Sequence, residues 1–166
     1  TATGQYPFAT ILSCIDSRVS AELVFDQGVG DIFSVRVAGN IVNEDLLGSM
    51  EFACKLAGTK VIVVLGHTSC GAVKGACDDA HLGNLTTLLS KIKPAVQAVA
   101  EPEDPAERTS QNLKFVDRVA ETNVRLTLEN IRRQSPVLRI MEDDGEIAMV
   151  VAMYDISNGE VRFMLP

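Results

Sequence analysis

The 166-residue sequence has no tryptophan, and only 5% of its residues are aromatic. Its apolar runs are short: a typical one, from Val61 to Leu65, is far below the roughly 20 residues that cross a bilayer, so no membrane segment is expected. Basic residues are in the minority, 15 against 22 acidic ones, which gives a net charge of -7. That sign disfavours binding to nucleic acid phosphates or anionic lipid, so we expect neither as a partner.

Cysteine is scarce, with four residues at positions 14, 54, 70 and 77. Their spacing is not that of a secreted disulfide framework, so we interpret them as core or metal-binding thiols, with Cys54 and Cys77 in the core. A reducing compartment follows, and the expected location is cytoplasmic by default. The periplasm is the alternative, because the sequence begins at Thr1 without Met.

Repeats, low-complexity tracts and linker-like stretches are missing, which predicts a single domain over residues 1–166. Strands are expected at residues 8–13, 32–37, 61–65, 147–154 and 161–165. The first three are expected to be buried on both faces. Helical patterns cover residues 43–56, 80–100 with a break at Pro94, and 106–134.

This alternation predicts an α/β fold: a mostly parallel β-sheet of about four strands plus an antiparallel edge strand, flanked by helices. In such sheets ligands bind beyond the carboxyl ends of the strands. Two polar motifs stand there: Cys14-Ile15-Asp16-Ser17-Arg18 after the first strand and Gly66-His67-Thr68-Ser69-Cys70-Gly71 after the third.

The two motifs supply two thiolates and one imidazole, a ligand set that selects zinc. Three ligands leave the fourth position open for a water whose pKa falls to about 7 in favourable sites. From spacing alone, a closed zinc site or a pair of inert thiols fits Cys14, His67 and Cys70 equally well. Asp16 and Arg18 alternate with Cys14, so all three can face one pocket, although a plain surface ion pair is the alternative.

Cys14-x-Asp16-Ser17-Arg18 followed by His67-x-x-Cys70-Gly71 resembles the β-class carbonic anhydrases. The similarity covers nearly the whole chain. It includes residues 22–28, 30–40, 48–53, 63–74 and 151–155.

The resemblance implies reversible hydration of carbon dioxide to bicarbonate and a proton by a zinc-bound hydroxide. One Zn²⁺ per chain would be held by Cys14, His67 and Cys70, with Asp16 and Arg18 as the family's catalytic dyad. Substrate-binding groups would be Gln5, Phe33, Ala38, Phe52 and the backbone N–H of Gly71.

The resemblance further implies self-association into a homodimer or homotetramer, in which part of the pocket wall comes from a neighbouring subunit. The helical arm that precedes the matching glutamine in the family is not part of these 166 residues. Because the chain lacks Trp, we expect the open, water-bound form rather than the self-inhibited form in which the aspartate binds zinc.

Two alternatives remain at this point. One is a hydrolase of a carbon dioxide analogue such as carbon disulfide, which would need a different access channel on the same ligands. The other is a non-catalytic, zinc-stabilised interaction domain whose metal site is closed by Asp16 or Cys77.

Overall fold

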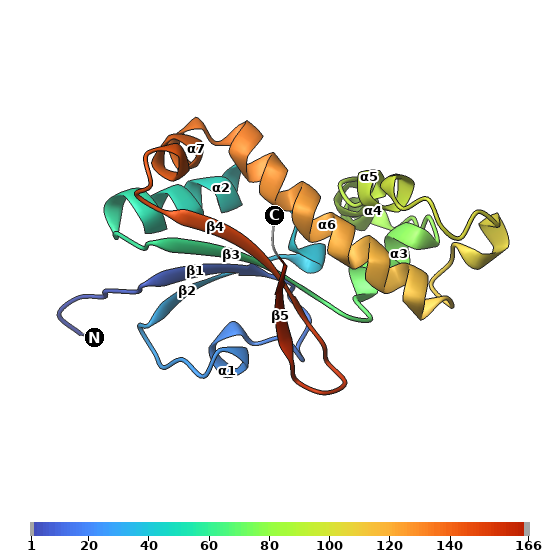
Figure 1. Ribbon diagram of the computed structural model, residues 1–166, viewed down its shortest axis with the longest axis horizontal. Coiled ribbons are helices and arrows are strands. Elements are labelled where there is room, and N and C mark those ends of the chain that lie inside the picture. Colours follow the sequence, from blue (N-terminus) through green and yellow to red (C-terminus); the bar gives the residue numbers. More distant parts are fainter. Residues whose placement is uncertain (1, 165–166) are drawn as a thin grey trace.

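A five-stranded sheet lies at the centre of the computed structural model, which describes residues 2–164 (Figure 1). Its strands are β1 (Ala9–Ser13), β2 (Ile32–Arg36), β3 (Val61–His67), β4 (Ala148–Tyr154) and β5 (Val161–Met164). They are ordered β2-β1-β3-β4-β5, with the first four parallel and β5 antiparallel to β4. The expected fold class is confirmed. Residue 165, which ended the last expected strand, lies outside the described residues.

Strand β2 corrects one expectation, since it is not buried on both faces. Ile32 is buried, whereas Ser34 and Arg36 are exposed. The reason is its place at the edge of the sheet, where β1 is its one neighbouring strand. Strand β1, in the interior of the sheet, is buried throughout.

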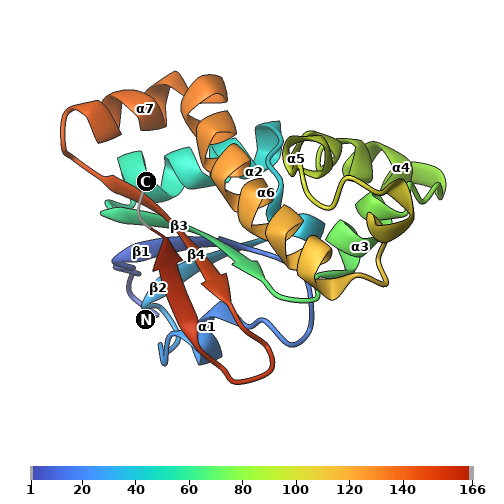
Figure 2. The ribbon, with the colours of Figure 1, turned by 45° about the vertical axis from the view of Figure 1, so that its right-hand side comes forward.

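Residues 2–164 form seven α-helices around the sheet: α1 (Ala21–Val24), α2 (Glu44–Glu51), α3 (Gly71–Cys77), α4 (Gly83–Ser90), α5 (Lys93–Ala98), α6 (Leu113–Gln134) and α7 (Pro136–Asp143). Short 3₁₀ turns η1 (Ala38–Asn40) and η3 (Pro105–Glu107) and a π-helical turn η2 (Phe52–Leu56) complete the described elements. Helices α2, α6 and α7 cover one face of the sheet, and α1 lies on the other (Figures 1 and 2).

The helix expected at 43–56 is confirmed, with α2 continuing into η2. Asn43 caps it by accepting a hydrogen bond from the N–H of Leu46 at 3.0 Å, and the helical stretch ends before Gly58, which has φ of 84°. The next expected helix is divided into α4 and α5. The division falls at residues 91–92, and Pro94 stands in the first turn of α5, where a proline costs no hydrogen bond.

The helix expected from residue 106 begins only at Leu113. Pro105 opens the turn η3, and Asn112 then caps α6 by accepting from the N–H of Phe115 at 3.2 Å. Helices α1, α3 and α7 lie outside the helical patterns expected at 43–56, 80–100 and 106–134. In α7 the signal was present, because Ser135 is its N-cap and Pro136 its first residue.

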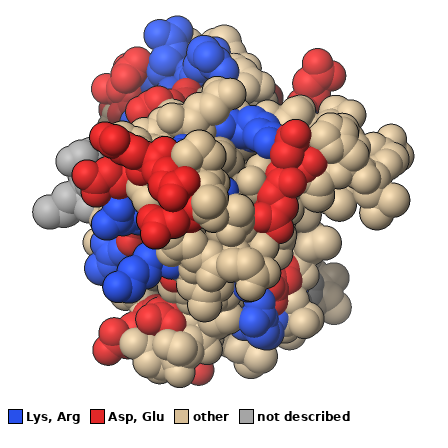
Figure 3. Space-filling model, turned by 90° about the vertical axis from the view of Figure 1, so that its right-hand side faces the viewer, with Lys and Arg blue, Asp and Glu red and all other residues tan. Residues whose placement is uncertain are grey.

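Helix α6 supplies much of the core between helices and sheet. Its buried face includes Phe115, Val119 and Ile131, and the opposite face of the sheet has a smaller core with Ile11 and Leu65. None of the helices formed by residues 2–164 is both long enough and apolar enough to cross a membrane. On the face that carries α3 to α5, acidic and basic side chains occur in small mixed groups (Figure 3).

Candidate metal centre

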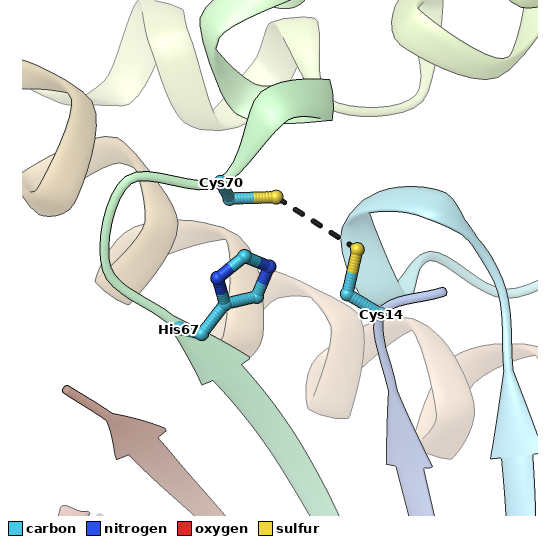
Figure 4. Close-up of side chains that lie close together, drawn as sticks. All are labelled: Cys14, His67 and Cys70. Atoms are coloured by element: carbon cyan, nitrogen blue, oxygen red, sulfur yellow. Dashed lines mark hydrogen bonds between the residues drawn. The ribbon is translucent and has the colours of Figure 1, made fainter. Parts of the chain in front are cut away.

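Two neighbouring strands bring the first two predicted ligands together. Ser13 at the end of β1 pairs in register with Leu65 of β3, so Cys14 and His67 leave the sheet side by side. Cys70 follows three residues later as the N-cap residue of α3. All three side chains are buried and point toward one another (Figure 4).

The distances in this cluster fit a single ion. The two sulfur atoms and a ring nitrogen all lie within 4.8 Å of one another, and the Cys14 and Cys70 sulfurs are 4.0 Å apart. Two thiolates on a tetrahedral zinc would be about 3.8 Å apart, given a Zn–S bond of about 2.3 Å. A disulfide would need about 2.05 Å, so the observed separation suits a shared metal ion and not a covalent bond.

The imidazole of His67 is prepared for a metal through its tautomer. Its Nδ1 is 2.9 Å from the carbonyl oxygen of Thr68, which fixes the proton on that nitrogen. The other nitrogen, Nε2, is fully buried and has no hydrogen-bond partner among residues 2–164. A buried lone pair without a partner is costly, and an ion between the three side chains would satisfy it.

The charge of the cluster is set by the paired thiols. A hydrogen bond from Cys70, aided by the backbone N–H of Gly39, lowers the pKa of Cys14 to about 4 despite its burial. The Gly39 nitrogen is 3.3 Å from the Cys14 sulfur. The pKa of Cys70 is raised, because it shares its proton with Cys14. Of the two thiols, Cys14 is therefore the one that loses its proton more readily.

Asp16 and Arg18 pair as the sequence indicates. Arg18 donates from Nε to Oδ1 at 2.9 Å and from a terminal nitrogen to Oδ2 at 2.7 Å, and its backbone N–H also reaches Oδ1. These bonds lower the pKa of Asp16 well below its usual range. Oδ2 lies 3.8 Å from Nε2 of His67, which puts the carboxylate beside the cluster and not within it. Ile15 points away and is 61% exposed.

Of the expected substrate-binding groups, two adjoin the cluster. Ala38 lies in η1 beside Gly39, whose N–H bonds the Cys14 sulfur, and Gly71 follows Cys70 as the first residue of α3. The turn η1 is tightly constrained: Gly39 has φ of 68°, and a Cβ added there would meet Cδ1 of Ile92 at 2.5 Å.

The remaining three do not reach the cluster of their own chain. Phe33 and Phe52 contact each other edge to face, 6.3 Å between ring centres, in a groove along edge strand β2 and α2. Gln5 is exposed and precedes β1, whereas Cys14 follows it. The strand alone separates them by roughly 16 Å.

The cysteines outside the cluster fit the core interpretation in different degrees. Cys54 is buried and its sulfur is 3.3 Å from the hydroxyl of Thr59. Cys77 is half-buried. Neither joins the three-residue group, which is the one such group within residues 2–164.

The groups that hold the ligand loops in place were not predicted from the sequence. Arg36 of β2 donates to the carbonyl oxygens of Cys14 at 2.9 Å and Asp16 at 2.7 Å. Asp117 and Asn123 of α6 bond to Ser69 and Gly39. Their partners are between 20 and 84 residues away in sequence, so no local pattern could have revealed them.

A mostly parallel sheet with a buried Cys/His/Cys cluster at the carboxyl ends of its strands defines a class of α/β protein with a candidate metal centre. The family model of carbonic anhydrase matches residues 9–161. "Carbonic anhydrase 2" of Mycobacterium tuberculosis is 37% identical over 158 residues, 95% of this chain and 74% of the relative. The carbonic anhydrase of Mycolicibacterium smegmatis is 33% identical, covering 95% of this chain and 75% of the relative.

Solved structures agree. One of the tetrameric β-carbonic anhydrases of Sordaria macrospora superposes with a TM-score of 0.84 at 25% identity, over 98% of this chain and 83% of that one. A β-carbonic anhydrase of Aspergillus fumigatus gives 0.81 at 28% identity, over 98% and 77%. The chain belongs to the carbonic anhydrase family, in its β class. It is an enzyme that hydrates carbon dioxide reversibly.

Proposed function

We propose that Cys14, His67 and Cys70 hold one Zn²⁺ and that this site carries the hydration of carbon dioxide to bicarbonate and a proton. The observation that carries the proposal is the buried, unpartnered Nε2 of His67 facing two cysteine sulfurs 4.0 Å apart. When bound, zinc supplies a Lewis acid that makes water a nucleophile near neutral pH. Within residues 2–164 no fourth ligand side chain joins these three, so the fourth ligand position is available to water.

Asp16 and Arg18 act on the nucleophile in this proposal. The guanidinium holds both carboxylate oxygens, so Asp16 remains ionised and is kept from becoming a metal ligand itself. Oδ2, next to His67, still has a lone pair that can accept the O–H of the attacking water. This hydrogen bond from the water to Asp16 would orient a lone pair of the water oxygen toward carbon dioxide.

The substrate pocket is completed by a second copy of the chain. Ala38 and the N–H of Gly71 adjoin the metal ligands, while Phe33 and Phe52 line a groove along β2 and α2 and Gln5 precedes β1. The open edge of β2 beside Phe33 is where a second copy can pack. Both a homodimer and a homotetramer satisfy this requirement.

Stopped-flow measurement of carbon dioxide hydration on zinc-loaded protein tests the proposal, with metal content determined on the same sample. We expect turnover with one zinc per chain, and loss of turnover after chelation. One zinc per chain without turnover would instead favour a zinc-stabilised interaction domain. Turnover of carbon disulfide in place of carbon dioxide would favour the analogue hydrolase.

Asp16→Asn tests the role of the carboxylate. The variant should keep its zinc but lose about 100-fold in kcat/KM. An amide has one acceptor oxygen, so it cannot accept hydrogen bonds from Arg18 and from water through two oxygens as the carboxylate does. An unchanged rate would remove Asp16 from the mechanism.

A further inference from the structure

Helix α6 passes beside both loops that carry the metal ligands. It packs against η1, β3 and α3, and Figures 1 and 2 show it crossing from the carboxyl end of the sheet to α7. Two of its polar side chains, six residues apart, turn toward these loops instead of toward solvent. Asp117 reaches the loop between His67 and Cys70, and Asn123 reaches the turn η1 beside Cys14.

Asp117 holds the loop between His67 and Cys70. Its Oδ1 accepts a hydrogen bond from the backbone N–H of Ser69 at 2.8 Å. Ser69 has φ of 56°, a left-handed conformation that is unfavourable for a residue with a side chain. The preceding Thr68 is held from the other side, because its N–H donates to the carbonyl oxygen of Tyr154 at 3.0 Å. With both intervening residues fixed, the position of Cys70 relative to His67 is fixed as well.

Asn123 holds the other half of the cluster. Its Nδ2 donates to the carbonyl oxygen of Gly39 at 2.8 Å, and the side chain is only 3% exposed. The N–H of the same glycine donates to the Cys14 sulfur at 3.3 Å. A hydrogen bond to a ligand sulfur sets how much charge that sulfur gives to a metal, so the orientation of Gly39 matters to the ion.

We propose that Asp117 and Asn123 are positioning residues of the metal centre, one for each ligand loop, and that α6 thereby fixes the spacing between Cys14 and the His67–Cys70 pair. The inference rests on the proposed zinc site. Neither residue touches the ion or the substrate; each acts through a backbone group that carries or orients a ligand.

Two near-isosteric exchanges give opposite expectations. Asp117→Asn keeps an oxygen that accepts from Ser69, so metal affinity should stay within about threefold of the original. Asn123→Asp puts a carboxylate oxygen against the Gly39 carbonyl oxygen, so affinity should fall roughly 10- to 100-fold. Asp117→Ala removes the acceptor and should cost a similar factor.

Matched controls separate positioning from general stability. Asp78 makes the same kind of bond away from the cluster, its Oδ1 accepting from the N–H of Ser110 at 2.8 Å. Thr127 is buried on α6 one turn beyond Asn123. Asp78→Ala and Thr127→Ala should lower the melting temperature of the metal-free protein without weakening metal binding.

Cobalt(II) substitution provides the readout. We expect wild-type protein to give the intense visible bands of a tetrahedral thiolate site, with Asp117→Ala and Asn123→Asp shifting these bands and weakening cobalt affinity in competition with a chelator. Because Asp117 is only half-buried, Asp117→Ala should fold, and it keeps the test valid if Asn123→Asp does not fold. Variant spectra and affinities equal to wild type would overturn the inference alone. A wild-type protein that binds no metal would instead overturn the proposed function.

Discussion

The two cysteines of the cluster differ in their surroundings. The sulfur of Cys14 accepts from the Gly39 N–H and from Cys70, which lowers its pKa to about 4, whereas the hydrogen bond to Cys14 and burial raise the pKa of Cys70. Their types and spacing were readable in the sequence, and so was the pairing of Asp16 with Arg18. The bond between Gly39 and Cys14 was not, because it joins residues 25 positions apart through a backbone group.

Cys14→Ser should weaken zinc binding more than roughly 100-fold and abolish hydration activity, since a hydroxyl does not replace a thiolate on zinc. Zinc content after gel filtration against a weak chelator measures the effect. Cys54→Ser is the control, because that thiol is buried outside the cluster. Retention of zinc by Cys14→Ser would contradict the ligand set.

Cys77 should be unusually unreactive. Burial, with the charge of Asp78 as a second cause, raises the pKa of its thiol to about 11. At pH 8 the thiolate fraction, and with it the rate of alkylation by iodoacetamide, should be at least roughly 100-fold below that of free cysteine, and should rise with pH. Peptide mass spectrometry follows this site separately. Asp78→Asn should speed the reaction, and labelling of Cys77 at the rate of free cysteine would contradict the pKa.

At the scale of elements, local sequence signals located the helix ends and strands that depend on neighbouring residues. Asn43 marked the start of α2, and the β-branched runs marked β1 and β3. The apolar spacing of α6 was visible, but its start was placed seven residues too early, because the helical turn η3 lies just upstream and the N-cap role of Asn112 was not recognised. The partial exposure of β2 depends on its place at the sheet edge, which is decided by tertiary pairing.

Gly39→Ala should destabilise the protein by about 1–3 kcal/mol, because a positive φ and the contact with Ile92 both oppose a Cβ there. Gly58→Ala is the matched comparison: its φ is 84°, but no atom lies within 4 Å of the added Cβ. It should cost only about 1 kcal/mol, from the backbone conformation alone. Urea unfolding of the metal-free proteins measures both. Equal losses would show that the turn η1 is less constrained than its geometry indicates.

At the scale of the whole molecule, a single chain does not bring all of the predicted site residues together. The metal ligands converge within one chain, but Gln5, Phe33 and Phe52 remain apart from them. The family resemblance named these residues, and we propose that they serve the metal centre of another subunit. Their role stays a prediction about the assembly.

Subunit mixing tests that prediction. Gln5→Ala and Cys14→Ser chains should each be impaired alone. In a mixed dimer, the intact cysteine of one chain faces the intact Gln5 of the other, so mixing should restore activity at about a quarter of the sites in a statistical mixture. Hydration activity before and after exchange is the measurement. No recovery, with exchange verified by native mass spectrometry, would mean that Gln5 does not act across the interface.

The most direct test of the central claim is zinc K-edge X-ray absorption spectroscopy on the zinc-loaded chain. The account predicts two sulfur ligands at about 2.3 Å, one imidazole nitrogen at about 2.0–2.1 Å and one further light atom supplied by solvent. A coordination sphere with three or four sulfurs, or one without any sulfur, would contradict it.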